Sequence, residues 1–268
     1  MKPVSFSSLN EWLTCGEKWR LKRVEHYPSR ASWWSVGGSA VHEASARMEV
    51  DNTVTLDVAW ESAFGDQVER TLEESGEPVE AWQAAGKRTA ALPDGENGLW
   101  WHDNGPRMIQ RHLDAVEKAR YATVMIDGEV AVELDLTVGL PDWGKVAEPL
   151  QVRSIIDRVY DGPNGPVIVD LKTGRRTPPS SLQLAFYALA VQRATGILVQ
   201  HAAYSMLRTG SLVEVSLADI DVSSISRSVA LFTTAVDEKI FIPNPGYLCP
   251  TCDVRSYCSY YTKESKDD

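Results

Sequence analysis

The sequence lacks long apolar runs. No segment approaches the roughly 18 uninterrupted apolar residues of a membrane-spanning helix, and the first 20 residues hold no stretch of signal-peptide length. We therefore expect a soluble, intracellular protein with no membrane partner. Positive charge is also scarce, since 27 Lys and Arg against 37 Asp and Glu give a net charge of −10. This net negative charge argues against a protein that covers nucleic acid non-specifically. Any contact with a polyanion must then be confined to local basic patches.

Other features that the sequence lacks limit the functional class of the protein further. There is no G-x4-G-K-[ST] loop, which excludes a fused P-loop ATPase, and there is neither an internal repeat nor a low-complexity segment. The 268 residues are 43% hydrophobic, enough to bury a sizeable core, and we expect residues 1–268 to form a single domain. Two short basic segments, 18–23 and 172–176, are candidate polyanion contacts, although either could be an ordinary solvated surface.

Cysteine is rare, and its placement is informative. Cys249, Cys252 and Cys258 lie close together near the C-terminus, whereas Cys15 is near the N-terminus. A reducing cytosol disfavours disulfides, so the residues alone leave three readings: an iron-sulfur cluster, a zinc site, or inert buried thiols. The cluster is modestly favoured, because structural zinc sites usually pair two short motifs and Cys15 has no companion. In the first two readings the cysteines join the two ends of the chain.

Hydrophobic periodicity predicts a helical first half and a mixed second half. We expect helices over 5–24 and 37–50 and a mostly helical segment over 57–120, interrupted by turns at 92–98 and 102–106. Strands are expected at 129–138, 153–160, 166–174, 198–207 and 211–217, and helices at 181–196 and 222–240. This order predicts a three-layer α/β core with a central mixed sheet, flanking helices and a helical insertion over 57–120.

The stretch "VIVDLKTG" places two opposite charges at the end of a buried strand. Alternation puts Asp170 and Lys172 on one face, with Leu171 on the other. Asp157 lies on the preceding strand, and the tight turn at 161–165 brings it to the same cleft. Facing carboxylates repel one another unless a cation lies between them, and hard divalent ions commonly fill such sites in phosphate chemistry. An ordinary ion pair at a strand end is the competing interpretation.

Three further polar residues have weaker signals. His42 lies in a predicted helix and could supply a nitrogen ligand, although a lone helical histidine more often serves packing. Gln183 and Tyr187 are four residues apart on a predicted helix and share a face, where they could touch a substrate or simply pack.

These residues together resemble a known family. The iron-sulfur members of the RecB-like branch of the PD-(D/E)xK nuclease superfamily, such as the AddB nuclease domain and the CRISPR-associated RecB-like exonucleases, carry a similar ordered set of motifs. In this chain the set is "GGSAVHE", "IIDRVY", "VIVDLKTG", "QLAFY" and "CPTCDVRSYC", preceded by Cys15. Isoleucine stands before Asp157 where the superfamily name has proline, a departure common among RecB-like members.

The resemblance assigns roles to the candidate residues and implies a restriction-endonuclease-like fold. It implies that His42, Asp157, Asp170 and the Leu171 carbonyl bind Mg²⁺ or Mn²⁺, that Lys172 is catalytic, and that Gln183 and Tyr187 form a Q-x3-Y motif beside the site. Glu133, on the preceding strand, is a weaker candidate that would support the ligands. The resemblance also implies a [4Fe-4S] cluster held by Cys15, Cys249, Cys252 and Cys258, and a location in the cytoplasm of a bacterium or phage-infected cell.

The leading functional hypothesis is a metal-dependent DNA exonuclease that cuts phosphodiester bonds from DNA ends in recombination, repair or phage DNA processing. Its substrate is then single-stranded DNA or DNA ends, and a helicase or recombination protein is an expected partner because the chain has no ATPase of its own. One alternative is a catalytically idle iron-sulfur module that binds DNA ends. The other is a divalent-metal phosphoesterase acting on a different substrate.

Overall fold

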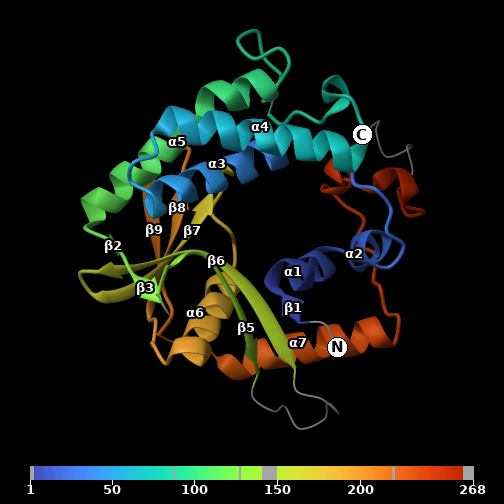
Figure 1. The fold of residues 1–268 in the computed structure, drawn as a ribbon. Helices are drawn as coiled ribbons and strands as arrows, with labels where there is room; N and C mark the ends of the chain where they lie inside the picture. Colours follow the sequence, from blue (N-terminus) through green and yellow to red (C-terminus); the bar gives the residue numbers. More distant parts are fainter. Residues whose placement is uncertain (1–2, 87, 127, 141–149, 219–220, 262–268) are drawn as a thin grey trace.

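A seven-stranded mixed sheet lies at the centre of the molecule (Figure 1). The computed structural model describes residues 3–86, 88–126, 128–140, 150–218 and 221–261. The strands are β1 (Val4–Ser5), β2 (Ala122–Thr123), β3 (Met125–Ile126), β4 (Glu129–Val130), β5 (Val132–Gly139), β6 (Gln151–Gly162), β7 (Gly165–Lys172), β8 (His201–Met206) and β9 (Ser211–Ser216). The main path runs β1-β6-β7-β8-β9, with β2 and β5 also paired to β6, while β3 and β4 form a separate ribbon.

Helices lie on both sides of this sheet. They are α1 (Phe6–Thr14), α2 (Gly16–Arg23), α3 (Trp33–Val50), α4 (Leu56–Ser75), α5 (Gly98–Ala119), α6 (Leu182–Thr195) and α7 (Val222–Asp237), with short 3₁₀ helices η1 (Val79–Ala81), η2 (Cys249–Thr251) and η3 (Arg255–Tyr257). None of the helices in the described ranges is both long and apolar enough to cross a membrane.

The two faces of the sheet bury different helices. On one face, Val159 and Ile168 pack with residues of α1, α6 and α7, including Phe186. On the other face, Tyr160 and Val169 pack with residues of α3, α4 and α5. The result is a helix–sheet–helix sandwich, because each strand alternates its side chains between two apolar layers. The expected three-layer mixed α/β core is confirmed.

Helix α3 starts earlier than the sequence suggested. We expected a glycine break followed by a helix over 37–50, but the helix begins at Trp33 and continues through Gly37. A Cβ atom on Gly37 would lie only 2.1 Å from the Trp101 ring of α5. The glycine therefore allows α3 and α5 to approach closely rather than ending a helix.

The predicted turn over 102–106 is wrong, since these residues lie inside α5. Pro106 has no N–H, so the His102 carbonyl loses its partner within the helix. The Trp60 indole of α4 donates a hydrogen bond to that carbonyl over 3.1 Å. Gly105 makes room for the same indole, because a Cβ atom there would lie 2.1 Å from the Trp60 ring. A tertiary contact thus replaces the missing bond and keeps the helix continuous.

The predicted N-terminal helix over 5–24 is divided in two at Cys15. Cys15 adopts an extended conformation with φ −164° and ψ 107°, between α1 and α2. The break brings α2 beside the C-terminal segment, where the Gly16 N–H donates to the Ile242 carbonyl over 2.8 Å and the Arg30 N–H to the Asp253 carbonyl over 2.9 Å. Helix α2 and the C-terminal segment that carries three cysteines therefore lie side by side (Figure 1).

Strand β6 pairs with different strands along its length. Its N-terminal end pairs with β1 at Val152 and Arg153, and the antiparallel ladder with β7 begins only at Arg158. Because β5 pairs with Val152, Arg153 and Arg158 from the other side, β1 and β7 occupy the same edge of β6. The register of β7 with β8 continues to Lys172. Strands β6 and β7 therefore separate between Arg158 and Asp157, which leaves room for polar side chains.

Candidate metal centre

Asp157 lies where β6 and β7 separate. Its Oδ2 atom accepts a hydrogen bond from the Leu171 backbone N–H over 2.7 Å, so a carboxylate takes the place of a ladder carbonyl. The N–H and C=O of one residue in an antiparallel strand point to the same neighbour. The Leu171 carbonyl therefore also lies on the Asp157 side, while the Leu171 side chain is buried in the core.

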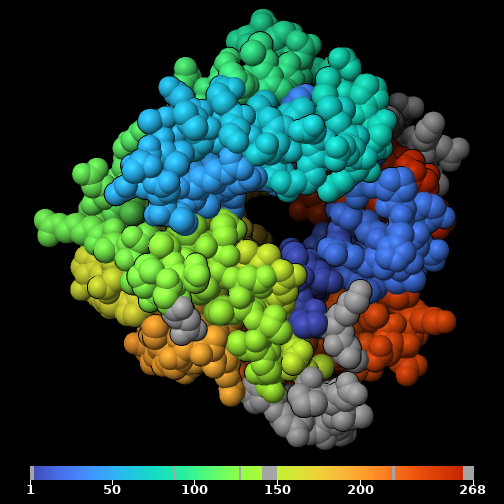
Figure 2. Space-filling view, viewed as in Figure 1, coloured from blue at the N-terminus to red at the C-terminus, as the bar shows by residue number. Residues whose placement is uncertain are grey.

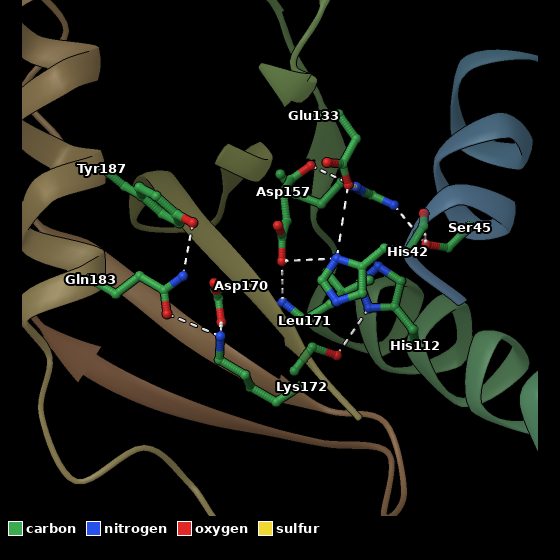
Figure 3. Close-up of polar contacts among 12 residues, drawn as sticks. His42, Ser45, His112, Glu133, Asp157, Asp170, Leu171, Lys172, Gln183 and Tyr187 are labelled. Carbon is green, nitrogen blue, oxygen red and sulfur yellow. Dashed lines mark hydrogen bonds and ion pairs between the residues drawn. The ribbon is translucent and has the colours of Figure 1, made fainter. Parts of the chain in front are cut away.

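Three elements bring possible metal ligands together (Figure 3). His42 of α3, Glu133 of β5 and Asp157 of β6 each offer one ligand atom, and these atoms all lie within 4.8 Å of one another. His42 Nδ1 is 3.5 Å from Asp157 Oδ2 and 4.0 Å from Glu133 Oε1. Two carboxylate oxygens with one imidazole nitrogen form a donor set that suits Mn²⁺ and is compatible with Mg²⁺.

Glu133 has an unusual backbone conformation. Its φ of +50° lies in the left-handed region, which is uncommon for residues other than glycine. The register of β5 with β6 pairs Val132 with Arg158 and Leu134 with Ile156, so it places Glu133 directly opposite Asp157, yet these two residues do not form a ladder pair themselves. Such strain persists only where surrounding contacts impose it, and it is typical of functional sites. The sequence suggested only a supporting place for Glu133, whereas in the structure its carboxylate lies among the candidate ligand atoms.

Asp170 is almost completely buried and faces the same space. Lys172 Nζ lies 2.6 Å from its Oδ2 atom, an ion pair that places both charges on one face of β7. Within the described part of the chain, this oxygen has no hydrogen bond of good geometry. Lys172 offsets only one negative charge, and the nearby Asp157 carboxylate adds a second, so the surroundings of Asp170 fit a further cation. The residues present therefore suit a divalent ion.

Gln183 and Tyr187 share one face of α6 and point toward the same charges (Figure 3). Lys172 Nζ donates to Gln183 Oε1 over 3.0 Å, and Gln183 Nε2 donates to the Tyr187 hydroxyl over 2.8 Å. These two hydrogen bonds orient the ammonium group of Lys172 toward Asp170 instead of toward bulk water.

The acidic side chains affect one another's ionisation. Burial and the nearby Asp157 carboxylate raise the pKa of Asp170 to about 7, despite opposing effects from Lys172 and His42. Burial opposes the ionised form of Asp157, but the charge and hydrogen bond of His42 outweigh it and lower the Asp157 pKa. Burial also opposes a charged His42, yet the carboxylates around it, Asp157 first, raise its pKa. Burial and Asp157 raise the pKa of Glu133. This crowding of negative charge is what a bound cation would relieve.

The metal centre opens to solvent through a cavity of about 1110 Å³, to which His42 and Glu133 both contribute. In the space-filling view the face of the molecule is hollowed at its centre, between α3 and α4 on one side and α1 on another (Figure 2). The elements that carry the ligands therefore border an open space.

The two basic segments have different surroundings in the structure. The cations of α2 all have acidic partners, which the sequence did not suggest. Lys18 and Lys22 pair with Glu11 and Asp253, Arg20 with Glu17 and Glu25, and Arg23 with Glu11. In the segment 172–176, Arg175 pairs with the buried Glu96, while Arg176 is exposed. The charge of the candidate polyanion contact on α2 is thus largely neutralised within the protein.

The four cysteines occur as free thiols in the two terminal segments that meet. Backbone N–H groups point at two of the sulfurs: Asn244 N lies 3.4 Å from Cys15 Sγ, and Gly246 N lies 3.3 Å from Cys249 Sγ. Among the described residues, no three cysteines bring their sulfurs within 4.8 Å of one another. The four ligands of one zinc ion lie that close together, because each is about 2.3 Å from the metal, whereas the described cysteines stand farther apart than that in this structure.

The chain is similar to known proteins in sequence. The sequence profile of the PD-(D/E)XK nuclease superfamily matches residues 3–259. Gene 69 protein of Mycobacterium phage D29 is 29% identical over 209 residues, which cover 72% of this chain and 70% of that protein. Among solved structures, SSO0001 aligns over 94% of this chain and 95% of its own, with a TM-score of 0.37 and 10% identity. The profile match takes in the ligand group, Lys172 and all four cysteines. The chain therefore belongs to the PD-(D/E)XK nuclease superfamily, whose members are nucleases that use divalent metals.

Proposed function

We propose that the protein is a Mg²⁺- or Mn²⁺-dependent DNA exonuclease that hydrolyses phosphodiester bonds from DNA ends. The observation that carries the proposal is the convergence of His42, Glu133 and Asp157 from three separate elements, beside Asp170 and Lys172. An ordinary strand-end ion pair does not require a buried carboxylate to face two others. Recombination, repair or phage DNA processing is the setting that we infer, and the phage origin of one relative supports the last of these.

Each residue has a chemical role in this proposal. Asp157, Asp170, Glu133, His42 and the Leu171 carbonyl hold the cation, which when bound polarises the phosphate and lowers the pKa of a water molecule. Lys172, steadied by Gln183, orients or deprotonates the attacking water and offsets the negative charge that develops on the phosphate. Tyr187 fixes the Gln183 amide so that its oxygen faces Lys172.

We infer that a single strand reaches the site through the open space beside it. The hollow in Figure 2 is bordered by several elements, and a flexible single strand fits such a space more easily than a stiff duplex. Because no P-loop motif occurs in the sequence, we infer that a helicase or recombination protein supplies single-stranded ends.

We further propose that Cys15, Cys249, Cys252 and Cys258 hold a [4Fe-4S] cluster. Each thiolate of such a cluster binds a different iron, so the sulfurs stand farther apart than the ligands of one zinc ion. The backbone N–H groups that point at Cys15 and Cys249 support thiolate ligands, because hydrogen bonds to the sulfurs stabilise their negative charge.

End-labelled linear and circular DNA, each single- and double-stranded, incubated with the purified protein tests the nuclease proposal. With Mg²⁺ or Mn²⁺ we expect short products from linear DNA, intact circles, and no cleavage after chelation. Asp170→Ala should abolish cleavage while the protein still folds and binds DNA, and His42→Ala should disable it with partial rescue by high Mn²⁺. Cleavage of circles would contradict the exonuclease assignment, and an active Asp170→Ala variant would contradict the site.

A further inference from the structure

Arg158 follows Asp157 on β6 and is completely buried. Its guanidinium makes four hydrogen bonds: Nε to Glu49 Oε1 at 2.6 Å, Nη2 to Ser45 Oγ at 2.7 Å, and Nη1 to both the Asp157 carbonyl at 2.6 Å and Glu133 Oε1 at 3.2 Å. A buried charge is retained only with such partners, since desolvation of an unpaired ion is very costly. The planar fork of arginine can reach partners in several directions at once, which the ammonium group of lysine cannot.

The partners of Arg158 lie on the same three elements as the candidate ligands. His42, Ser45 and Glu49 fall on one face of α3, at spacings of three and four residues. Arg158 forms hydrogen bonds with Ser45 and Glu49. These bonds fix the rotation of α3 about its axis and its position along that axis, and α3 carries His42. The bond of Arg158 to Glu133 fastens the side chain of a residue whose backbone is strained. Its bond to the Asp157 carbonyl fixes β6 at the third ligand.

The network continues away from the metal centre. Glu49 accepts a hydrogen bond from the Tyr160 hydroxyl over 2.5 Å, and His112 Nε2 lies 3.4 Å from Glu49 Oε1. His112 Nδ1 in turn lies 3.0 Å from Ser205 Oγ. Serine, histidine and glutamate in this order resemble a nucleophilic set, but Ser205 is 1% exposed and His112 is 0% exposed, so no substrate reaches them. This distant part of the network has a structural role only. A substitution there serves as a control for substitutions next to Arg158.

We propose that Arg158 is a positioning residue that holds α3, β5 and β6 in register, so that His42, Glu133 and Asp157 can share one cation. The inference rests on the metal centre of the proposed function and adds the group that assembles it. Arg158 touches neither substrate nor metal in this role. It acts through Glu133, through the Asp157 backbone and through the helix face shared with His42.

Two serine variants separate positioning from general stability. Ser45 and Ser205 are both buried, both belong to the network, and both can be changed to alanine without leaving an unpaired carboxylate. Only Ser45 contacts Arg158. We expect Ser45→Ala to lower the melting temperature at least as much as Ser205→Ala, because Ser45 also donates to the His42 carbonyl over 3.0 Å and Arg158 Nη2 loses its partner, whereas only Ser45→Ala weakens metal binding. The Arg158→Lys change keeps the positive charge but loses the planar guanidinium group with its several donors. It should weaken Mn²⁺ binding about 10- to 100-fold.

The measurement is calorimetric titration of the DNA-free protein with Mn²⁺. The Asp157→Asn variant lacks one candidate ligand, so the Mn²⁺ binding that it loses is the binding at this centre. Equal Mn²⁺ affinity in Arg158→Lys and the parent protein would overturn the inference, as would equal weakening by Ser45→Ala and Ser205→Ala. If Arg158→Lys does not fold, the serine pair still decides. A parent protein that binds Mn²⁺ at this centre but cuts no DNA would overturn the proposed function and leave the role of Arg158 standing.

Discussion

At the scale of single residues, Asp170 is expected to oppose stability. Its pKa is raised to about 7 by burial and by Asp157, so ionising it at pH 8 is harder in the folded than in the unfolded protein. The isosteric Asp170→Asn change removes this repulsion, while the partly exposed Lys172 retains its bond to Gln183. We expect the metal-free variant to gain about 1–2 kcal/mol at pH 8 and to lose cleavage, as measured by chemical unfolding and DNA digestion.

Asp161→Asn provides the control for that change. Asp161 lies on the same hairpin but is exposed, so its substitution should alter neither stability nor cleavage appreciably. An Asp170→Asn protein less stable than its parent at pH 8 would show that the ion pair with Lys172 outweighs the repulsion.

A second residue-scale prediction concerns Glu49 and acid. Burial opposes its ionisation, but His112 and Arg158 outweigh that effect and lower its pKa from 4.5 to about 2. A carboxyl with a depressed folded-state pKa stabilises the protein above its unfolded pKa, and this stabilisation is lost as pH falls toward the folded value. We expect Glu49→Gln to cost about 3 kcal/mol at pH 6 and much less near pH 2.5. Urea unfolding across this range measures the difference, and a cost that does not vary with pH would contradict the assignment.

At the scale of helices, two glycines with opposite surroundings give opposite predictions. A methyl group added to Gly105 of α5 would lie 2.1 Å from the Trp60 ring, whereas one added to Gly65 of α4 would meet nothing within 4 Å. Gly65→Ala should stabilise the protein by about 0.5–1 kcal/mol, because alanine loses less conformational freedom in a helix. Gly105→Ala should instead destabilise it by about 1–3 kcal/mol, because the ring must shift. Thermal unfolding measures both, and stabilisation by both would mean that the contact between α4 and α5 is not tight.

At the scale of the whole molecule, the cysteines link ends that are far apart in sequence. Ion pairs of Asp253 with Lys18 and Lys22 already hold these segments together, and a cluster that binds only the folded chain adds its binding free energy to folding. We expect anaerobically purified protein to be brown, with about four iron and four sulfide per chain, and Cys252→Ser to lose the colour and become unstable or insoluble.

Metal analysis separates this prediction from the nuclease proposal. Stoichiometric zinc without iron, or a Cys252→Ser protein as thermostable as its parent, would contradict the cluster but not the metal centre. Redox changes of the cluster should leave cleavage unaffected, because phosphodiester hydrolysis transfers no electrons.

The sequence by itself determined the features that depend on local periodicity. Alternation along β7 placed Asp170 and Lys172 together, the turn at 161–165 brought in Asp157, and a spacing of four put Gln183 and Tyr187 on one face of α6. The longer strands and the later helices followed for the same reason, whereas the two-residue strands β1, β2 and β3 were not predicted. Each of these features is set by residues only a few positions apart, so the pattern carries the information.

Only the tertiary structure decided the features that depend on distant partners. Pro106 stays inside α5 because Trp60 of another helix bonds the freed carbonyl, and Gly37 is a packing residue because Trp101 lies against it. Glu133 joins the ligand group through a backbone distortion that strand periodicity cannot show. The cations of α2 are neutralised partly by Asp253, which follows more than 200 positions later. Long-range packing and charge pairing leave no local trace in a sequence, because the residues that meet are chosen by the fold.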